Sequence, residues 1–158
     1  MTPQLTFEKV SFGDTLPTLE LKVTARTVVM GASSSRDWQP QHHDHAWATT
    51  RAGTKDIFLN TPNQAGFIER YLTDWTGPHG RLGRMKFRMR RPVYPGETLV
   101  FSGTVRNTAV DELGCGWVDV DIELTVDAEV ATEASARLAI PKDADDNPWR
   151  RANDDWRP

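Results

Sequence analysis

The stretch Asn-Thr-Pro-Asn-Gln-Ala-Gly-Phe-Ile-Glu-Arg-Tyr-Leu-Thr-Asp-Trp-Thr-Gly-Pro, residues 60–78, predicts one long helix. Asn60 can cap its start, and Pro62 suits the first turn because the helix needs no N–H there. Gly77 and Pro78 are a stop signal. Between these signals, apolar side chains recur at the spacing of one helical face: Phe67, Ile68, Tyr71, Leu72 and Trp75. We expect this wide apolar face to lie buried against a sheet.

After the helix, apolar and polar residues alternate, as in β-strands. Apolar and basic residues alternate over 85–90, and further strands are predicted at 98–105, 117–127 and 130–140. The last three are separated by connections of hairpin length. One helix followed by consecutive antiparallel strands predicts an α+β fold, in which a curved antiparallel sheet wraps one central helix.

The N-terminal part has weaker signals. Residues 5–20 are expected to be an irregular lead-in, and β-branched residues predict a strand over 21–29. Ser33–Ser35 should break that strand. One or two helical turns are predicted over 46–50, because Asp44 can cap them.

The length of 158 residues suits a single domain that buries its own core. We expect this domain over residues 1–141 and a partly ordered C-terminal extension over 142–158. Trp149 and Trp156 in the extension either dock on a partner subunit or lie on a frayed terminus. Cys115 is the single cysteine, so an internal disulfide is excluded.

The formal net charge of −3 argues against a nucleic-acid-binding protein. The sequence contains no apolar run of signal-peptide length, and no stretch approaches the ~20 apolar residues that span a bilayer. We therefore expect a cytoplasmic protein without a nucleic acid or a membrane as partner.

A basic strip interrupts this acidic chain, with six Lys or Arg residues and no acidic residue between Arg81 and Arg91. It suits a small polyphosphate ligand better than a nucleic acid duplex. An equally good interpretation is a solvated strand face whose charges pair with neighbouring residues.

The segment 36–45 contains three of the four histidines, and it places Asp37 five residues before His42 with Pro40 between them. A carboxylate and an imidazole held together can position a water molecule and move its protons near neutral pH. A polar surface turn rich in histidine is the alternative. A metal site at His43-Asp44-His45 is not expected, because consecutive residues rarely point at one ion and no second ligand cluster follows.

The spacing from Asp37 through Pro40 to His42, with Ala48 following after five residues, resembles the motif of the MaoC-like (R)-specific enoyl-CoA hydratases. Residues 91–99 and 11–17 resemble the strand-turn-strand segment and the lead-in of that family. The resemblance implies the hot-dog fold.

Three positions depart from the family pattern: Arg36 replaces a Gly, Gln39 replaces an Asn, and residues 60–63 lack the His-Gly at the helix start. A narrower resemblance, through residues 36–44, 55–60 and 70–78, is to actinobacterial MaoC-like subunits that hydrate steroid side-chain acyl-CoA thioesters. Those subunits work with a second, degenerate hot-dog subunit.

The resemblance implies an enzyme of lipid metabolism that adds water syn across the double bond of an enoyl-CoA. The coenzyme A thioester is the substrate, and no cofactor is expected. The implied assembly is a homodimer or a heteromer with a second hot-dog subunit. We expect Asp37 to exchange a proton with water and C2, and His42 to orient and polarise the water, although coupled groups titrate as a unit.

Further site residues are expected around this pair. The thioester oxygen gains negative charge as water adds, so free backbone N–H groups at the helix start, at Asn63 or Gln64, are the expected donors. Candidates for the coenzyme A phosphates are Arg84, Arg88 and Arg91. Candidates for an apolar acyl pocket, which core packing explains equally well, are Trp38, Trp47 and Phe58.

Two other functions remain open. A hot-dog thioesterase would use an acidic residue of the central helix, Glu69 or Asp74, to activate water at the thioester carbon. However, the helical pattern places Glu69 off the apolar face. A thioesterase mechanism of this kind would also give the Asp37/His42 pair no role. A non-catalytic subunit that completes a partner's pocket is the second alternative, and an intact Asp/His pair argues against it.

Overall fold

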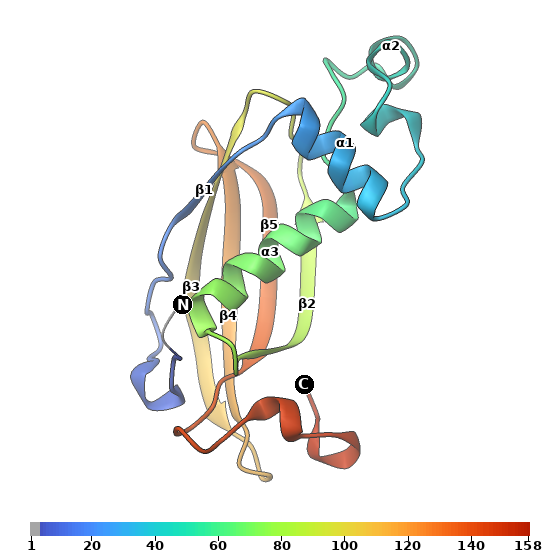
Figure 1. The fold of residues 1–158 in the computed structure, drawn as a ribbon. Helices are drawn as coiled ribbons and strands as arrows, with labels where there is room; N and C mark the ends of the chain where they lie inside the picture. The colour runs from blue at the N-terminus through green and yellow to red at the C-terminus, as the bar shows by residue number, and fades with distance from the viewer. Residues whose placement is uncertain (1–3) are drawn as a thin grey trace.

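The computed structural model describes residues 4–158 as a curved, five-stranded antiparallel sheet around one long helix, α3 (Figure 1). The strand order is β1-β3-β4-β5-β2, so β1 and β2 are the two edges. This arrangement confirms the predicted α+β hot-dog fold. The bounds are Leu19–Lys22 for β1, Arg81–Met89 for β2, Thr98–Val110 for β3, Gly116–Val126 for β4, Glu129–Ala139 for β5 and Thr61–Thr76 for α3.

Helix α3 begins and ends at its predicted signals. The Asn60 side chain accepts a hydrogen bond from the Asn63 N–H, and Pro62 lies in the first turn. Gly77 follows the last turn with a φ of 79°, which lies in the left-handed region that favours glycine. The helix buries one face, with the side chains Gln64, Ile68, Tyr71, Leu72 and Thr76.

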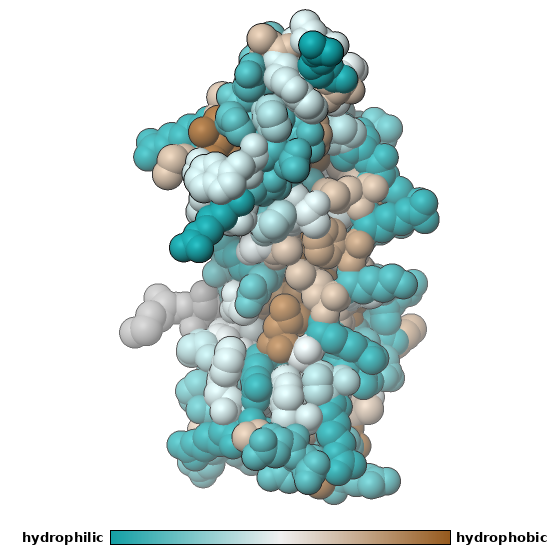
Figure 2. Space-filling view, turned by 90° about the vertical axis from the view of Figure 1, so that its right-hand side faces the viewer, coloured by the Kyte–Doolittle hydropathy of each residue, from teal (hydrophilic) through white to brown (hydrophobic). Residues whose placement is uncertain are grey.

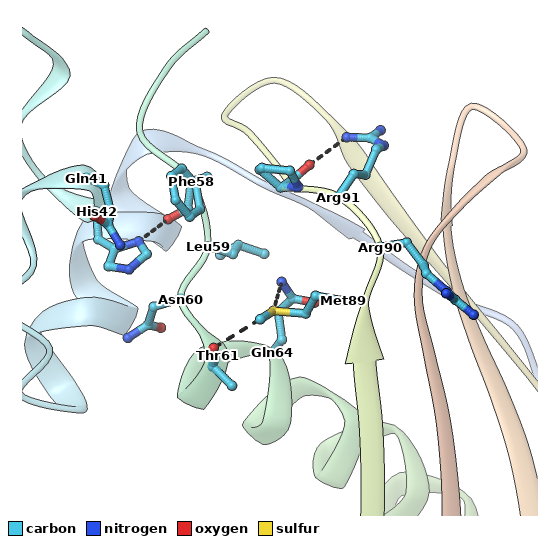
Figure 3. A pocket seen from close by; sticks show the side chains of 11 residues that line it. Gln41, His42, Phe58, Leu59, Asn60, Thr61, Gln64, Met89, Arg90 and Arg91 are labelled. Carbon is cyan, nitrogen blue, oxygen red and sulfur yellow. Dashed lines mark hydrogen bonds between the residues drawn. The ribbon is translucent and has the colours of Figure 1, made fainter. Parts of the chain in front are cut away.

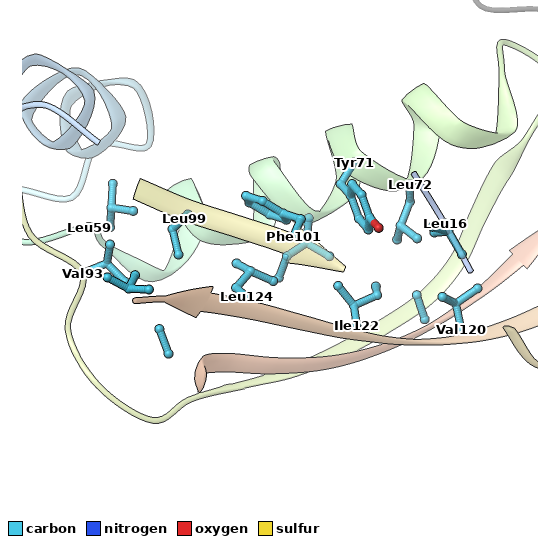
Figure 4. Close-up of a cluster of buried hydrophobic side chains, with 14 of the residues drawn as sticks. Leu16, Leu59, Tyr71, Leu72, Val93, Leu99, Phe101, Val120, Ile122 and Leu124 are labelled. Carbon is cyan, nitrogen blue, oxygen red and sulfur yellow. The ribbon is translucent and has the colours of Figure 1, made fainter. Parts of the chain in front are cut away.

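The core lies between α3 and the concave face of the sheet. Figure 4 shows Tyr71 and Leu72 of the helix pointing toward the strands. The ring of Tyr71 packs against Phe101 of β3 with centroids 5.5 Å apart. In β4, Ile122 and Leu124 are buried, while Asp121 and Glu123, which alternate with them, are exposed. Because burying each Leu or Ile contributes about 1.5–3 kcal/mol, this layer fixes the helix on the sheet.

The four strands predicted after the helix are all present, and each predicted range overlaps an observed strand. The largest difference is in β3, which continues beyond residue 105 to Val110, past a register shift between Val105 and Asn107. The alternation of apolar and polar residues ends near this shift. An extra residue of β3 at the shift turns the side chains that follow it to the opposite face of the sheet.

The predicted strand over residues 21–29 is wrong. Strand β1 ends at Lys22, and helix α1 follows over Ala25–Ser34. Thr24 and Thr27, whose β-branched side chains predict a strand, instead form a reciprocal capping box that starts α1. Val28 becomes fully buried, so tertiary packing outweighs the weak helix propensity of β-branched residues.

The short helix predicted over 46–50 is confirmed as α2, His45–Trp47, and the Asp44 carboxylate caps it by accepting from the Trp47 N–H at 3.0 Å. A π-helical turn, Ala48–Ala52, continues it further than expected. Helix α1 packs beside the start of α3, and α2 lies beyond α1 at the same end of the molecule (Figure 1).

The C-terminal extension folds back on the sheet instead of fraying (Figure 1). It contains two 3₁₀-helical turns, Pro148–Arg150 and Asn153–Asp155. Trp156 packs on Trp117 of β4 with ring centroids 5.0 Å apart, and the Arg81 guanidinium lies 3.6 Å from the Trp156 ring. Because Trp156 packs on its own chain, the prediction of a frayed terminus is wrong for this residue, and a contact with a partner subunit stays a prediction.

Within residues 4–158, none of the helices has the length and apolar content required to cross a bilayer.

Candidate active site

Asp37 and His42 come together near the start of α3, where α1 packs against this helix. Asp37 lies in the turn after α1, where its N–H donates to the Ala32 carbonyl at 2.9 Å. His42 ends a 3₁₀-helical turn, Pro40–His42, which Pro40 starts. The Asp37 Oδ2 and His42 Nε2 atoms are 3.5 Å apart. The loop therefore places the predicted pair side by side.

The orientation of His42 follows from its second ring nitrogen. His42 Nδ1 lies 2.7 Å from the Phe58 carbonyl oxygen, which can only accept, so Nδ1 carries a proton and donates it. In a neutral ring, Nε2 is then an acceptor that faces the Asp37 carboxylate. The Phe58 ring supports the imidazole edge-on, with centroids 4.9 Å apart, and His42 is 5% exposed. Both acceptors are close enough for one water molecule to contact them together.

Asn60 connects this pair to α3. Its Nδ2 donates to Asp37 Oδ2 at 3.0 Å and to Ser35 Oγ at 2.8 Å, while its Oδ1 accepts from the Asn63 N–H at 3.1 Å. Asn60 is 1% exposed, and all of its amide groups have partners. The sequence predicts Asn60 only as a helix cap, and no local signal links it to a carboxylate 23 residues earlier.

The pKa of Asp37 lies below its ordinary value. The hydrogen bond from Asn60 is the largest cause; burial of the carboxylate opposes it. The Gln39 N–H and the nearby His42 and His43 rings add to the lowering. Asp37 is therefore ionised at neutral pH and available as a proton acceptor.

A cavity of about 340 Å³ opens beside His42, between the start of α3 and the end of β2 (Figure 3). His42 and Asn60 lie on its wall, and Asp37 contacts both of them from behind the lining residues. The other lining residues are Gln41, Phe58, Leu59, Thr61, Gln64, Met89, Arg90, Arg91 and Pro92. Sequence reasoning missed most of these residues because they come from separate elements that only the fold brings together.

The predicted backbone donors at Asn63 and Gln64 are wrong, since both N–H groups are already used. The Asn63 N–H donates to the Asn60 side chain, and the Gln64 N–H donates to the Asn60 carbonyl at 3.2 Å. Pro62 has no N–H. Within residues 4–158, the Thr61 N–H has no hydrogen-bond partner, and Thr61 lines the cavity. Thr61 is therefore the donor that the first turn offers.

The three arginines predicted for coenzyme A phosphates do not form a cluster. Arg91 lines the cavity and pairs with Glu97 at 3.1 Å. Arg84 and Arg88 are exposed on β2. They alternate with residues that pack against the core, so the alternation of a strand turns both toward the outer face of the sheet.

Of the three residues predicted to wall an acyl pocket, Phe58 lines the cavity, whereas Trp38 and Trp47 do not. Trp38 is 69% exposed, and Trp47 is half-buried in α2. The apolar walls come instead from Leu59 and Met89.

The candidates for other chemistry lie apart from the cavity. Glu69 and Asp74 are exposed on α3, which places the predicted thioesterase residues away from it. Among residues 4–158, no group of three or more His, Cys, Asp or Glu side chains is arranged to hold a metal ion. His43 and His45 are both exposed.

The family model of the MaoC-like domain matches residues 8–130 of this chain. This chain belongs to the MaoC-like domain family. A MaoC-like relative, the 3-oxo-4,17-pregnadiene-20-carboxyl-CoA hydratase beta subunit of Mycobacterium tuberculosis, is 39% identical over 100 residues, which are 63% of this chain and 75% of the relative.

Two solved structures are also similar to this MaoC-like chain. A chain in the crystal structure of the ChsH1-ChsH2 complex from Mycobacterium tuberculosis is 31% identical with a TM-score of 0.74, over 82% of this chain and 98% of that chain. The unliganded R-hydratase PhaJ1 from Pseudomonas aeruginosa is 18% identical with a TM-score of 0.78, over 89% and 88% of the two chains, and shares the fold.

Two departures of this MaoC-like domain from the expected motif leave the site geometry intact. Arg36, which stands where a glycine was expected, has a φ of 55°. This left-handed conformation explains why glycine suits the position, and Arg36 adopts it at some cost in strain. Gln39 stands in place of Asn, and its backbone N–H donates to Asp37 Oδ1 at 3.3 Å. The backbone thus supplies a contact that does not depend on the side chain.

Proposed function

We propose that this protein is an enoyl-CoA hydratase, a hydro-lyase that adds water to a 2-enoyl-CoA thioester and forms a 3-hydroxyacyl-CoA. The observation that carries the proposal is the Asp37 Oδ2–His42 Nε2 separation of 3.5 Å beside a cavity, with His42 Nδ1 committed to the Phe58 carbonyl. Membership of the MaoC-like family and the hydratase named among its relatives support the same reaction.

In the proposed mechanism, one water lies between Asp37 Oδ2 and His42 Nε2. The ionised Asp37 takes a proton from the water while the water oxygen bonds to C3, and the π electrons move toward the thioester as an enolate. Asp37 then returns a proton to C2, so the C3–O and C2–H bonds form on one face of the substrate. His42 orients and polarises the water throughout, and its fixed Nδ1–H···O=C bond keeps Nε2 aimed at the site.

The enolate oxygen needs donors as its charge develops. The Thr61 N–H at the start of α3 is the donor we assign, because its neighbours Asn63 and Gln64 have N–H groups that are already paired. The positive end of the α3 dipole adds a favourable field at this point.

The substrate we infer is a bulky acyl-CoA of the steroid side-chain class. The 39% identical relative acts, by its name, on 3-oxo-4,17-pregnadiene-20-carboxyl-CoA. The cavity of about 340 Å³ lies at the small end of ligand pockets, which span roughly 300–1,000 Å³. A fused-ring acyl group therefore requires further walls from a second subunit.

A second hot-dog subunit is the partner we propose. The similar chain in the ChsH1-ChsH2 structure belongs to a complex, and that likeness supports a heteromer. Within residues 4–158, strand β2 pairs only with β5, so one side of this edge strand has unpaired backbone groups in the described part of the chain. On the β2 side of the molecule, Figure 2 shows apolar side chains between hydrophilic ones, as in a surface that another subunit covers.

The test measures loss of enoyl absorbance and release of free thiol in parallel, using a panel of linear and steroid-type enoyl-CoA thioesters. We expect hydration without thiol release, with the purified chain or after a second hot-dog subunit is added. Asp37→Asn and His42→Ala should lower kcat/KM for hydration by ~10³-fold, whereas His43→Ala, at the exposed neighbouring histidine, serves as the matched control. Thiol release without hydration would replace the hydratase by a thioesterase.

A further inference from the structure

Gln64 is a buried polar residue in the wall of the same cavity as His42 (Figure 3). It lies in the first turns of α3 and is 1% exposed. Its Oε1 accepts a hydrogen bond from the Thr132 hydroxyl of β5 at 2.7 Å. Because Thr132 is fully buried, this bond fixes the amide, and the Nε2 donors must point the other way.

The Nε2 group has only a poor acceptor there. It lies 3.3 Å from the Met89 sulfur, and the Thr61 hydroxyl approaches the same sulfur at 3.9 Å. A thioether is a weak acceptor, so two donors converge on one atom that satisfies neither well. A buried amide donor in this state destabilises the empty site, and an oxygen in place of the sulfur would remove that cost.

Met89 can move to admit such an oxygen. It is the last residue of β2, an edge strand, and its side chain is 40% exposed. Methionine is unbranched and adapts its shape at little cost. Its register partner on β5 is Thr132, which is why the sulfur and the Thr132 hydroxyl meet at the same amide.

The charges around the cavity favour a neutral oxygen. Gln64 and Thr132 are uncharged, and both arginines in the cavity wall already have carboxylate partners. Arg90 pairs with Glu133, and Arg91 with Glu97. A carbonyl or hydroxyl oxygen fits this environment better than a second carboxylate, which would compete for paired cations.

The position of Gln64 selects the part of the substrate that it meets. Asn60 contacts Asp37, and Gln64 follows four residues later, which is about 6 Å along the helix axis at ~1.5 Å per residue. Carbons of the acyl group beyond the reacting C2 and C3 reach this depth. The thioester stays at the start of the helix, beside Thr61.

We propose that Gln64 determines specificity by donating a hydrogen bond to a carbonyl or hydroxyl oxygen on the acyl group, which displaces the Met89 sulfur. The inference rests on the proposed hydratase function and narrows its substrate class to oxygenated acyl-CoA thioesters. Thr132 acts as a positioning residue that holds the Gln64 amide in the donating orientation.

The test compares trans-2-octenoyl-CoA with its 5-oxo, 6-oxo and 7-oxo forms in the assembly that hydrates enoyl-CoA. We expect the wild type to favour at least one oxo form by ~10-fold in kcat/KM. Gln64→Leu should abolish that preference, so that the oxo forms and octenoyl-CoA are hydrated with equal kcat/KM. Gln64→Met, which keeps the unbranched shape, repeats the test should the leucine variant fold poorly.

Two matched variants sharpen the result. Thr132→Val keeps the amide and the volume but removes the hydroxyl, so the preference should fall ~3-fold as the amide becomes free to rotate. Met89→Leu removes the competing sulfur and should leave the preference intact or raise it. Thermal unfolding of each variant checks that the fold is retained.

The outcomes separate the two proposals. A Gln64→Leu variant that loses the same factor on all four substrates would place Gln64 at the thioester or in the fold, and would overturn its role in specificity. An unchanged preference would overturn it as well. Absence of any hydration by the wild type would overturn the hydratase function, which the octenoyl-CoA reaction measures independently of Gln64.

Discussion

The two halves of α3 carry different kinds of side chain to the same sheet. At its start, Asn60 and Gln64 are buried polar groups that bond to Asp37 and to Thr132. Further along, Ile68, Tyr71 and Leu72 are buried core residues. Tyr71 and Leu72 point toward the strands (Figure 4). The apolar half supplies the stability that allows the first half to hold polar groups for chemistry. Substitutions in the two halves should therefore separate activity from stability.

The strongest test of this division is Asp37→Asn. It removes the ionised group while the amide oxygen can still accept from Asn60, so we expect kcat/KM for an enoyl-CoA to fall by ~10³-fold, within the range of general acid–base catalysis. The melting temperature should change little. Hydration kinetics and thermal unfolding of the same preparation measure both, and a large loss of stability would contradict the division.

Leu72→Ala tests the other half. Leu72 is fully buried, and truncating such a leucine costs about 2–5 kcal/mol of unfolding free energy. Urea unfolding should show this loss, while kcat of the folded protein stays near the wild-type value. A comparable fall in kcat under native conditions would show that the apolar half also shapes the site.

Asn60 both caps α3 and contacts Asp37, and two substitutions separate these roles. Asn60→Ala removes both the helix cap and the donor to Asp37, whereas Asn60→Ser retains a capping oxygen. Asn60→Ala should cost about 1 kcal/mol of stability more than Asn60→Ser. Both should lower kcat/KM by ~10-fold, because neither can hold Asp37 as the amide does.

The pH dependence of these variants gives a second measurement. Asn60 lowers the pKa of Asp37, so the ionised carboxylate and its contribution to stability persist above the ordinary pKa and are lost only as pH falls through the lowered one. Without the Asn60 donor, the pKa rises, and the acid limb of the kcat/KM profile should move to higher pH. An unmoved limb in both variants would assign the limb to another group.

The smallest effect is expected far from the site. Trp156→Ala removes the contacts with Trp117 and Arg81 that hold the C-terminal extension. An aromatic pair and a cation–π contact each contribute about 0.5–1 kcal/mol, so unfolding should become easier by about 1–2 kcal/mol. Hydration kinetics should not change. A change in kcat/KM would connect the extension to the site.

The local sequence by itself determined α3, the four following strands and the Asp37–His42 pair. Each of these features depends on residues near one another in the chain: a cap and a stop for α3, alternation for the strands, and a five-residue spacing around Pro40 for the pair. Interactions between residues that are close in the chain produce capping, stop and alternation patterns that can be recognised in the sequence.

The tertiary structure decided the rest. Packing made a helix of residues whose propensity suggested a strand, because Val28 is buried there. Folding brought Asn60 to Asp37. The N–H groups of Asn63 and Gln64, which the sequence predicts to be free, form hydrogen bonds with Asn60. It also separated the arginines that lie together in sequence. These contacts join residues far apart in the chain, or depend on which face of a strand is buried, and so only the assembled sheet and helix determine them.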